Sequence, residues 1–399
     1  MNETLILIPL VAASYLAAHV AFDWLARRYR IVSGAEYLLL GILLGPQVSG
    51  LLGGNVLEQF SPLISLGVGW TGALLGAQFV LPRLIRIPGE IYRIALVEAM
   101  LTLVVVSGAM VALLSWWLYL PVMDVLVPGF ALGALATVTS EAGIAVASAG
   151  RPKADPMVRQ FRVSAGLSAV IAMVALGLLS AIYHPDANVV PRGPTATEWV
   201  VINIAIGVIG GILFHLFVGE ERKPDRLFIA LVGGIVLVSG AAAYLRLSAM
   251  LSAAVFGAIL ANTSLRRGEI DASLARIERP LYFTLLVLAG AAWSPSPANW
   301  VLPTLIFLAV RGLSRVASAR IAARANNAMG TLGPHWGRGL LGQGGFALVL
   351  VLSYVQLTNF PAPGIVFSAV VFSVLLTDLL SARFAESVFD TDRPITGKS

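Results

Sequence analysis

One short segment of the chain carries side chains that could handle an ion in an apolar setting. Glu141 interrupts the run ALATVTSEAGIAVASAG at residues 134–150, and Thr137, Thr139 and Ser140 stand directly before it. A carboxylate can bind a proton or a small cation, and hydroxyl oxygens can complete the shell of a cation that has lost water. An acid in a segment apolar enough for lipid is costly, so it is a candidate functional residue by default. The pattern indicates a site where Na⁺ or K⁺ and a proton replace one another.

Glu141 also has a structural interpretation. It stands where a second half-helix would begin, so its charge could stabilise exposed N–H groups and the positive end of a helix dipole. If Glu141 alone cycles between a proton and a cation, exchange would be one for one and electroneutral. If Glu141 is a cap or half of an ion pair, its role is architectural. Both interpretations stay open on the sequence alone.

Two further charges lie inside apolar segments. Arg311 occurs in FLAVRGLSRVASARIAAR and Glu98 in RIALVEAMLTL. Arginine keeps its proton at working pH, so we predict that Arg311 is a fixed counterion whose partner is Glu141 or Glu98. Arg315 lies one turn nearer the cytoplasm, and we expect it to reach the membrane surface as an anchor.

The remaining polar residues of the apolar segments predict supporting roles. Asp23 and Asp378 lie near segment ends and are expected at the membrane interface. We expect His19 and His215 to pack between helices, and Asn203 to form a hydrogen bond with a neighbouring helix. The four histidines are scattered and the chain has no cysteine, so we expect neither a metal centre nor a cofactor.

Composition identifies the elements that must position these residues. Of the 399 residues, 58% are hydrophobic and 12% are charged, and the mean hydropathy is +0.86. Such values are typical of a polytopic membrane protein whose spans each need about 20 apolar residues. The polar stretch between residues 262 and 280 is treated as a connection too short to fold alone. The sequence predicts thirteen spans: 3–25, 35–52, 59–81, 90–118, 126–149, 160–183, 197–218, 226–244, 248–262, 280–293, 297–322, 337–357 and 362–383.

The basic residues orient these spans. Of 27 lysines and arginines, Arg311 and Arg315 lie within a span, and only Arg192 and Arg246 fall on the less basic side. The positive-inside rule then predicts an outside N-terminus and a cytoplasmic C-terminus in a cell (inner) membrane. Residues 1–25 lack a basic start and are expected to stay as a first span. The pI near 9.8 therefore needs no nucleic-acid partner, and the lipid bilayer is the expected surrounding.

A short internal similarity predicts two inverted halves. Residues 41–46 read GILLGP and residues 257–262 read GAILAN. Seven spans separate them, and an odd separation gives opposite orientations in the membrane. We predict a first repeat at 1–184, a linker with one span at 185–224, a second repeat at 225–386 and a short cytoplasmic tail at 387–399. A chance match is the alternative for so short a motif.

Under this repeat the span at 126–149 corresponds to the span at 337–357, and both are poor continuous helices. Hydroxyl side chains compete for backbone hydrogen bonds in the first span. In the second, glycines at 342, 344 and 345 surround Gln343, and each costs up to about 1 kcal/mol in a helix interior relative to alanine. We predict that both helices unwind at mid-length, which is tolerated only where protein or water covers the backbone.

The glycines of the second span also have a plainer interpretation. They could merely allow close helix packing, which we expect of Gly72 with Gly76 and of Gly207 with Gly211. Glu141 and Gln343, which stand at the two candidate breaks, favour the broken-helix interpretation.

Several stretches, in order along the chain, resemble the monovalent cation:proton antiporter (CPA) superfamily. YLLLGILLGPQVSGLL resembles its second span, and LLGAQFVLPRL is similar to the third-span end of the potassium-efflux branch, with Gln78 where Glu is common. ATVTSEAGIAVA resembles the Ala-Thr-Asp-Pro-Val-Ala-Val segment of the sodium/proton exchangers and places Glu141 on the Asp. GLLGQGGFALVL resembles the Arg-Gly-Glu-Phe-Ala-Leu-Val segment, with Gln343 at or near its Arg.

The resemblance implies an all-α fold of about thirteen transmembrane helices with inverted repeats and crossed discontinuous helices, the sodium/proton antiporter fold. It also implies a homodimer built by a dimerising and panel domain, together with a mobile core domain. One position departs from the family, because Ser168-Ala169 stands where members carry the cation-binding Asp of the sixth span.

These observations support three hypotheses about function, none of them an enzyme. The first is a secondary antiporter that exchanges Na⁺ or K⁺ for H⁺ by elevator-type alternating access. The second is a transport-incompetent membrane subunit or sensor, which the missing Asp favours. The third is an organic anion transporter, with Arg311 and half-helix N-termini facing the solute. The ion and proton site is predicted from six residues: Glu141, Thr137, Thr139, Ser140, Ser168 and Gln343.

Overall fold

The computed structural model describes residues 34–53, 58, 60–152, 154–184, 194–218, 224–264, 266–295, 300–356 and 362–391. Over these ranges the chain is helical and contains no strand. The predicted first span at 3–25, with His19 and Asp23, lies outside the described residues, as does Arg192.

Helices occupy every predicted span that falls within the described part of the chain, which confirms an all-α, multi-pass membrane protein. By length and composition, six of the described helical segments could cross a membrane, one of them formed by α7 and α8 together, and α17 with α18 adds a seventh if that pair, bent by 49°, is one span. The elements are α2 (Ala35–Leu44), α4 (Ser61–Ala77), α5 (Leu81–Leu84), α6 (Gly89–Leu118), α7 (Val122–Ala136), α8 (Glu141–Ala147), α9 (Pro156–Ile182), α10 (Ala196–Val218), α11 (Pro224–Tyr244), α12 (Ala249–Thr263), α13 (Arg267–Ala292), α14 (Val301–Ala325), α15 (Met329–Leu332), η1 (Trp336–Leu340), α16 (Phe346–Gln356), α17 (Pro363–Asp378) and α18 (Ser381–Thr391).

Two predicted boundaries were wrong. The polar stretch treated as a connection is largely helical, because α13 begins at Arg267 and continues through Pro280 into the apolar part. Arg266 forms an ion pair with Glu269 at this new helix start. The helix of the second predicted span ends at Leu44 rather than near residue 52, since Gly45 takes an extended conformation directly before Pro46.

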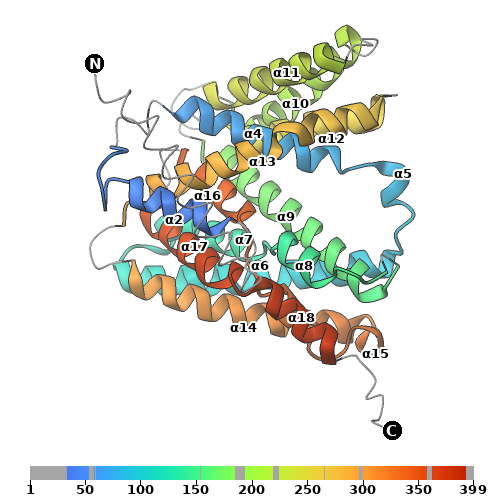
Figure 1. Ribbon diagram of the computed structural model, residues 1–399. Helices are drawn as coiled ribbons and strands as arrows, with labels where there is room; N and C mark the ends of the chain where they lie inside the picture. The colour runs from blue at the N-terminus through green and yellow to red at the C-terminus, as the bar shows by residue number, and fades with distance from the viewer. Residues whose placement is uncertain are drawn as a thin grey trace.

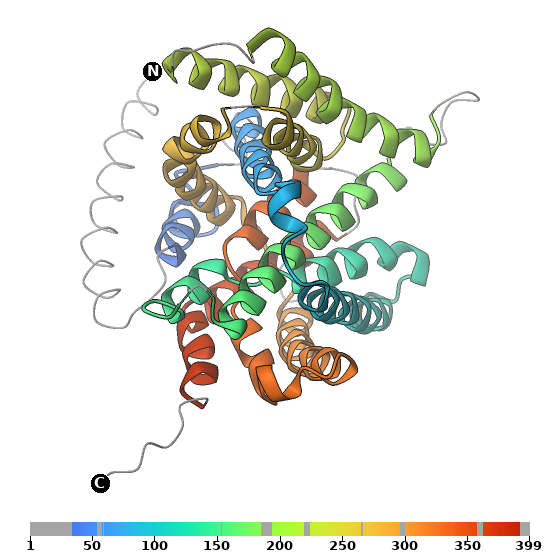
Figure 2. The ribbon, with the colours of Figure 1, turned by 90° about the vertical axis from the view of Figure 1, so that its right-hand side faces the viewer.

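The helices form two groups (Figure 1). The panel group consists of α2, α4, α10, α11, α12 and α13. The core group consists of α6, α7, α8, α9, α14, α16, α17 and α18. The view turned by 90° keeps this order, with the yellow-green α10 and α11 along one edge and the orange and red helices opposite (Figure 2). The two predicted helix breaks, in the spans at 126–149 and 337–357, lie within the core group.

Glycines bring the panel helices into backbone contact. A methyl group added at Gly76 of α4 would lie 1.9 Å from the Ala254 carbonyl oxygen of α12, and one at Gly72 would lie 2.3 Å from that of Met250. One at Gly207 of α10 would lie 2.3 Å from the Ser252 carbonyl oxygen. The predicted use of these glycines for close helix packing is confirmed.

Two predictions for polar residues of α10 have opposite outcomes. Asn203 is buried and its side-chain oxygen accepts a hydrogen bond of 2.5 Å from the Ser252 hydroxyl of α12, as predicted. His215 is exposed, at the edge of a small pocket that Leu227 of α11 and Leu260 of α12 also line, so the expectation that it is packed between helices was wrong. It lies within the last turn of the helix, where neighbouring helices cover less of the surface.

Candidate functional site

The first predicted break is confirmed between α7 and α8. Residues 137–140 are not helical, because the hydroxyls there bond to the backbone locally. Thr137 Oγ1 donates to the Ala134 carbonyl at 2.8 Å. Ser140 caps α8, where its Oγ accepts a hydrogen bond of 3.2 Å from the Gly143 amide.

The second break is confirmed between η1 and α16, at residues 341–345. The half before it is a short 3₁₀-helix rather than an α-helix. Gln343 braces this break. Its Nε2 donates to the Leu135 carbonyl of α7 at 2.9 Å, and its Oε1 accepts from the Ser373 hydroxyl of α17 at 2.5 Å.

The two breaks cross in direct contact. The Ser140 amide donates to the Gly342 carbonyl at 2.9 Å. A methyl group added at Gly344 would lie 3.0 Å from the Ser140 Cα, so glycine is what allows this approach. The crossing is thus a backbone contact between segments about 200 residues apart in the chain.

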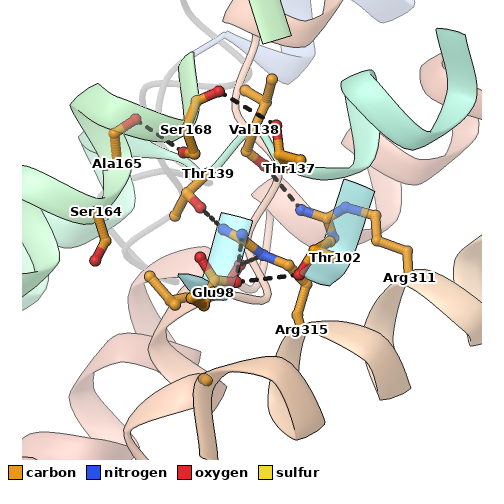
Figure 3. Close-up of polar contacts among 12 residues, drawn as sticks. Glu98, Thr102, Thr137, Val138, Thr139, Ser164, Ala165, Ser168, Arg311 and Arg315 are labelled. Carbon is orange, nitrogen blue, oxygen red and sulfur yellow. Dashed lines mark hydrogen bonds and ion pairs between the residues drawn. The ribbon is translucent and has the colours of Figure 1, made fainter. Parts of the chain in front are cut away.

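Arg311 of α14 serves both breaks and pairs with neither predicted carboxylate. Its Nη1 donates to the Leu341 carbonyl at 2.7 Å. Its Nη2 donates to the Val138 carbonyl at 3.0 Å (Figure 3). The prediction of an ion pair with Glu141 or Glu98 was therefore wrong. The physical reason is that both breaks expose carbonyls at helix ends, and these concentrate negative charge where the guanidinium lies.

Arg315 forms the ion pair with Glu98 that the sequence analysis predicted for Arg311. It is fully buried, so the prediction of a surface anchor was wrong. Its Nη1 lies 2.7 Å from Glu98 Oε1 of α6, and its Nη2 donates to the Thr139 hydroxyl (Figure 3). Glu98 Oε1 also accepts from Thr102 at 3.2 Å. Burial is affordable here because each charge has a partner close by.

A cavity of about 650 Å³ lies between the panel and core groups, beside the crossing. Helices α4 and α13 line it on the panel side. On the core side it is lined by α8, α9, both breaks and the end of α17. Its charged lining residues are Glu141, Arg162, Glu278 and Asp378.

Three of the six predicted site residues line this cavity. Glu141 is the first residue of α8, and its side chain is exposed there. Thr139 and Ser140 line the same wall. No lysine, arginine or histidine within the described ranges forms an ion pair with Glu141. Glu141 therefore faces the cavity without an ion-pair partner among the described residues.

The other three predicted site residues are buried around the breaks instead. Thr137 and Gln343 make the bonds described above. Ser168 donates to the Ala165 carbonyl of its own helix at 2.9 Å, and its carbonyl accepts from Thr137 at 3.2 Å. All three hydroxyl or amide groups are satisfied by protein atoms, so they hold the crossing in shape.

Two positions that bear on the missing acid also line the cavity. Ala169 of α9 does so, at the place where the resemblance implies an Asp. Asp378, the last residue of α17, was expected at the interface, and that expectation was wrong. Its side chain is 5% exposed, and its Oδ1 accepts from the Ser140 hydroxyl at 2.6 Å. The hydrogen bond to Ser140 places this helix end at the crossing.

The described residues contain no group of three or more histidine, aspartate or glutamate side chains placed to hold a metal ion. The cavity offers separate carboxylates and hydroxyls instead. Such a set suits a weakly held monovalent ion or a proton.

Comparison with known proteins identifies the fold. No protein-family model matches the chain. The ammonium/H(+) antiporter subunit AmhT of Alkalihalophilus pseudofirmus is 21% identical over 281 residues, which is 68% of this chain and 68% of that protein. A structure of the sodium proton antiporter MjNhaP1 from Methanocaldococcus jannaschii at pH 8 aligns over 97% of this chain and 98% of that one, with a TM-score of 0.69 and 14% identity.

An electron-microscopy structure of the same antiporter aligns over 98% of this chain and 99% of that one, with a TM-score of 0.61 and 16% identity. Identities this low compare folds and not substrates. The chain has the fold of the sodium proton antiporter MjNhaP1, which confirms the antiporter fold that its motifs predicted.

Proposed function

We propose that this protein is a secondary transporter that exchanges a monovalent cation for protons. The observation that carries the proposal is the cavity beside two crossed helix breaks. Its carboxylates form no ion pair with the described residues, and the space is large enough for a hydrated ion. Non-helical backbone and acids at membrane depth are costly and are found where ions or solutes pass.

The comparisons support the same class of function. MjNhaP1 is a sodium proton antiporter, and AmhT is a subunit of an ammonium/H(+) antiporter. Na⁺ and K⁺ were the cations expected from the sequence, and the name of AmhT adds NH₄⁺ as a third cation to test. All three carry one charge, which one carboxylate can balance.

Glu141 is our candidate for the exchanging carboxylate. In one state its carboxylate holds the cation, with the Thr139 and Ser140 oxygens nearby as further ligands. In the other state it holds a proton, so the loaded site is neutral in both. Arg311 and the Glu98–Arg315 pair do not carry the ion in this proposal, because their hydrogen bonds are directed to the breaks and to each other.

Transport in this proposal requires the core group to slide against the panel group, the elevator mechanism expected from the resemblance. The cavity lies between the two groups, which supports this division. We further propose an inner-membrane homodimer with a cytoplasmic C-terminus. Arg162 and Glu278 lie in or beside the basic connections assigned to the cytoplasmic side, and both line the cavity. The cavity then opens to the cytoplasm in this proposal.

A transport-incompetent subunit or sensor is the second candidate, and Ala169 is the observation that favours it. The organic anion hypothesis has lost its main support, because Arg311 is engaged by two carbonyls and does not line the cavity.

The test is proton movement in proteoliposomes loaded with a pH-sensitive dye, for wild type and the variant Glu141→Gln. We expect Na⁺, K⁺ or NH₄⁺ to drive proton movement in wild type, and the variant to lose it while its unfolding temperature stays unchanged. The matched control is Glu90→Gln, which removes an exposed carboxylate of α6. Absence of proton movement with all three cations would favour the incompetent subunit, and a response to organic anions alone would favour the third hypothesis.

A further inference from the structure

Asp378 is a buried carboxylate that the role of Glu141 does not explain. It is 5% exposed, yet it lines the cavity from the end of α17. No basic side chain in the described parts of the chain forms an ion pair with it. The other acid of the core group that is fully buried, Glu98, has Arg315 at 2.7 Å. A buried carboxylate without a fixed cation is costly, and protonation, hydrogen bonds or a cation from solution can offset that cost.

The hydrogen bonds of Asp378 fix it at the crossing. Its Oδ1 accepts from the Ser140 hydroxyl at 2.6 Å, and its backbone carbonyl accepts from the Ser381 hydroxyl at 2.7 Å. Ser140 is also the residue whose amide joins the two breaks. Asp378 therefore belongs to the same rigid unit as both breaks, and it would move with them.

The surroundings of Asp378 can accept an ion. Thr139, Ser140 and the non-helical Gly344 and Gly345 line the same cavity. On the panel side Tyr282 of α13 faces this point, because a methyl group added at Gly345 would lie 1.9 Å from the tyrosine hydroxyl oxygen. Ala169 of α9 lines the same core-side wall and contributes no acid.

We propose that Asp378 is a cation-binding and proton-binding residue of this cavity, where it supplies from α17 the carboxylate that α9 lacks. The proposal rests on the proposed function and adds a second acid to it. When the cation binds, the Asp378 carboxyl releases its proton to the cavity, and when the cation leaves, a proton returns to the same oxygen atoms. Charge balances at each step, because the cation–carboxylate pair and the carboxylic acid are both neutral.

The first test uses the wild-type protein. A hydrophobic carbodiimide modifies accessible protonated carboxyls, and mass spectrometry of the peptides reports which ones react. We expect modification of Asp378 in choline buffer and protection as Na⁺, K⁺ or NH₄⁺ increases. Glu98 is the internal control, since its pairing with Arg315 makes its reaction independent of the cation. The proposal is contradicted if the reagent does not modify Asp378 in choline buffer. It is also contradicted if the modification of Asp378 in each of the three cations is as strong as in choline.

The second test compares Asp378→Asn with Asp378→Glu in the proteoliposome assay. We expect the asparagine variant to lose about tenfold or more of the cation-driven proton flux, and the glutamate variant to keep part of it because it keeps a carboxylate. Asp124→Asn is the matched control, as Asp124 is exposed at the start of α7.

These arms separate the two proposals. If wild type exchanges and Asp378→Asn does so at the same rate, Asp378 has no ion-binding role and the proposed function stands. If wild type moves no protons, the proposed function fails, and carbodiimide protection still decides whether Asp378 binds a cation.

Discussion

Two arginines one turn apart on α14 perform different tasks. Arg311 satisfies the carbonyls of both breaks, and Arg315 neutralises Glu98 and holds Thr139 at the cavity wall. The first arrangement keeps the crossing assembled, and the second joins it to α6. Both side chains are buried, so the stability of the fold depends on the partners that offset their charges.

The Glu98–Arg315 pair gives a stability prediction. Glu98→Gln leaves Arg315 as an uncompensated buried charge, which typically costs about 3–5 kcal/mol. Replacing both partners, as in Glu98→Leu with Arg315→Met, should recover most of this loss. Thermal unfolding in detergent measures both effects, with Glu90→Gln as the exposed control. The interpretation fails if the double variant loses as much unfolding free energy as the single variants Glu98→Leu and Arg315→Met lose in total.

Arg311→Lys tests the bridging of the two breaks. A lysine ammonium lacks the planar fork with which the guanidinium reaches two carbonyls. We expect the free energy of unfolding to fall by about 1–3 kcal/mol, which is the cost of leaving one buried carbonyl unsatisfied. A variant as stable as wild type would mean that one of the two hydrogen bonds contributes nothing.

Residue types identified part of the site, and geometry was needed for the rest. Glu141 stands out because it is an acid inside an apolar segment. Asp378 was missed because it lies close to a predicted span end, and only the hydrogen bond to Ser140 shows that this end is at the crossing. Arg311 and Arg315 share one helix face, so sequence spacing cannot tell which of them meets Glu98.

At the scale of the elements, the two breaks hold together through backbone contacts at glycines. The hydroxyl cluster before Glu141 and the glycines around Gln343 were sufficient to predict both breaks. The 3₁₀ geometry of η1 and the helical start of α13 were not predictable, since tertiary contacts decide them locally.

The predicted inverted repeat has a matching pair of contacts. A methyl group at Gly41 of α2 would lie 2.1 Å from a carbonyl oxygen of α13, and one at Gly257 of α12 would lie 2.2 Å from a carbonyl oxygen of α4. In the proposed repeat α2 corresponds to α12 and α4 to α13. The paired glycines thus have equivalent neighbours, which supports an internal repeat, and its inverted orientation stays a prediction.

Gly342→Ala tests how tightly the crossing is packed. Its new methyl group would lie 2.4 Å from the Ser381 Cβ, and overpacking of this kind typically costs about 1–3 kcal/mol. Adding Ser381→Gly should relieve part of the clash, because the Cα of residue 381 would still lie 3.0 Å from the added methyl group. Gly330→Ala is the control, because nothing lies within 4 Å of the added methyl group. Equal unfolding temperatures for Gly342→Ala and Gly330→Ala would contradict the described packing.

In the whole molecule the cavity lies between the panel and core groups, so these two groups must move relative to each other in the proposed mechanism. The proposed orientation can be tested directly because the chain has no cysteine. Ala243, near the end of α11, and Ala325, at the end of α14, are both exposed. The ends of α11 and α14 lie on opposite sides of the molecule (Figure 1), so the test variants are Ala243→Cys and Ala325→Cys. We expect a membrane-impermeant maleimide to label Ala243→Cys in intact cells and Ala325→Cys only after permeabilisation. The reverse pattern would invert the assigned topology.

The proposed exchange couples a cation to protons in one cavity. Its most direct measurement is reciprocal coupling in proteoliposomes that contain the wild-type protein. An imposed gradient of Na⁺, K⁺ or NH₄⁺ should drive protons the opposite way, and an imposed pH gradient should drive uptake of the same cation. Cation movement without protons, proton movement without a cation, or no movement of either in both experiments would contradict the account.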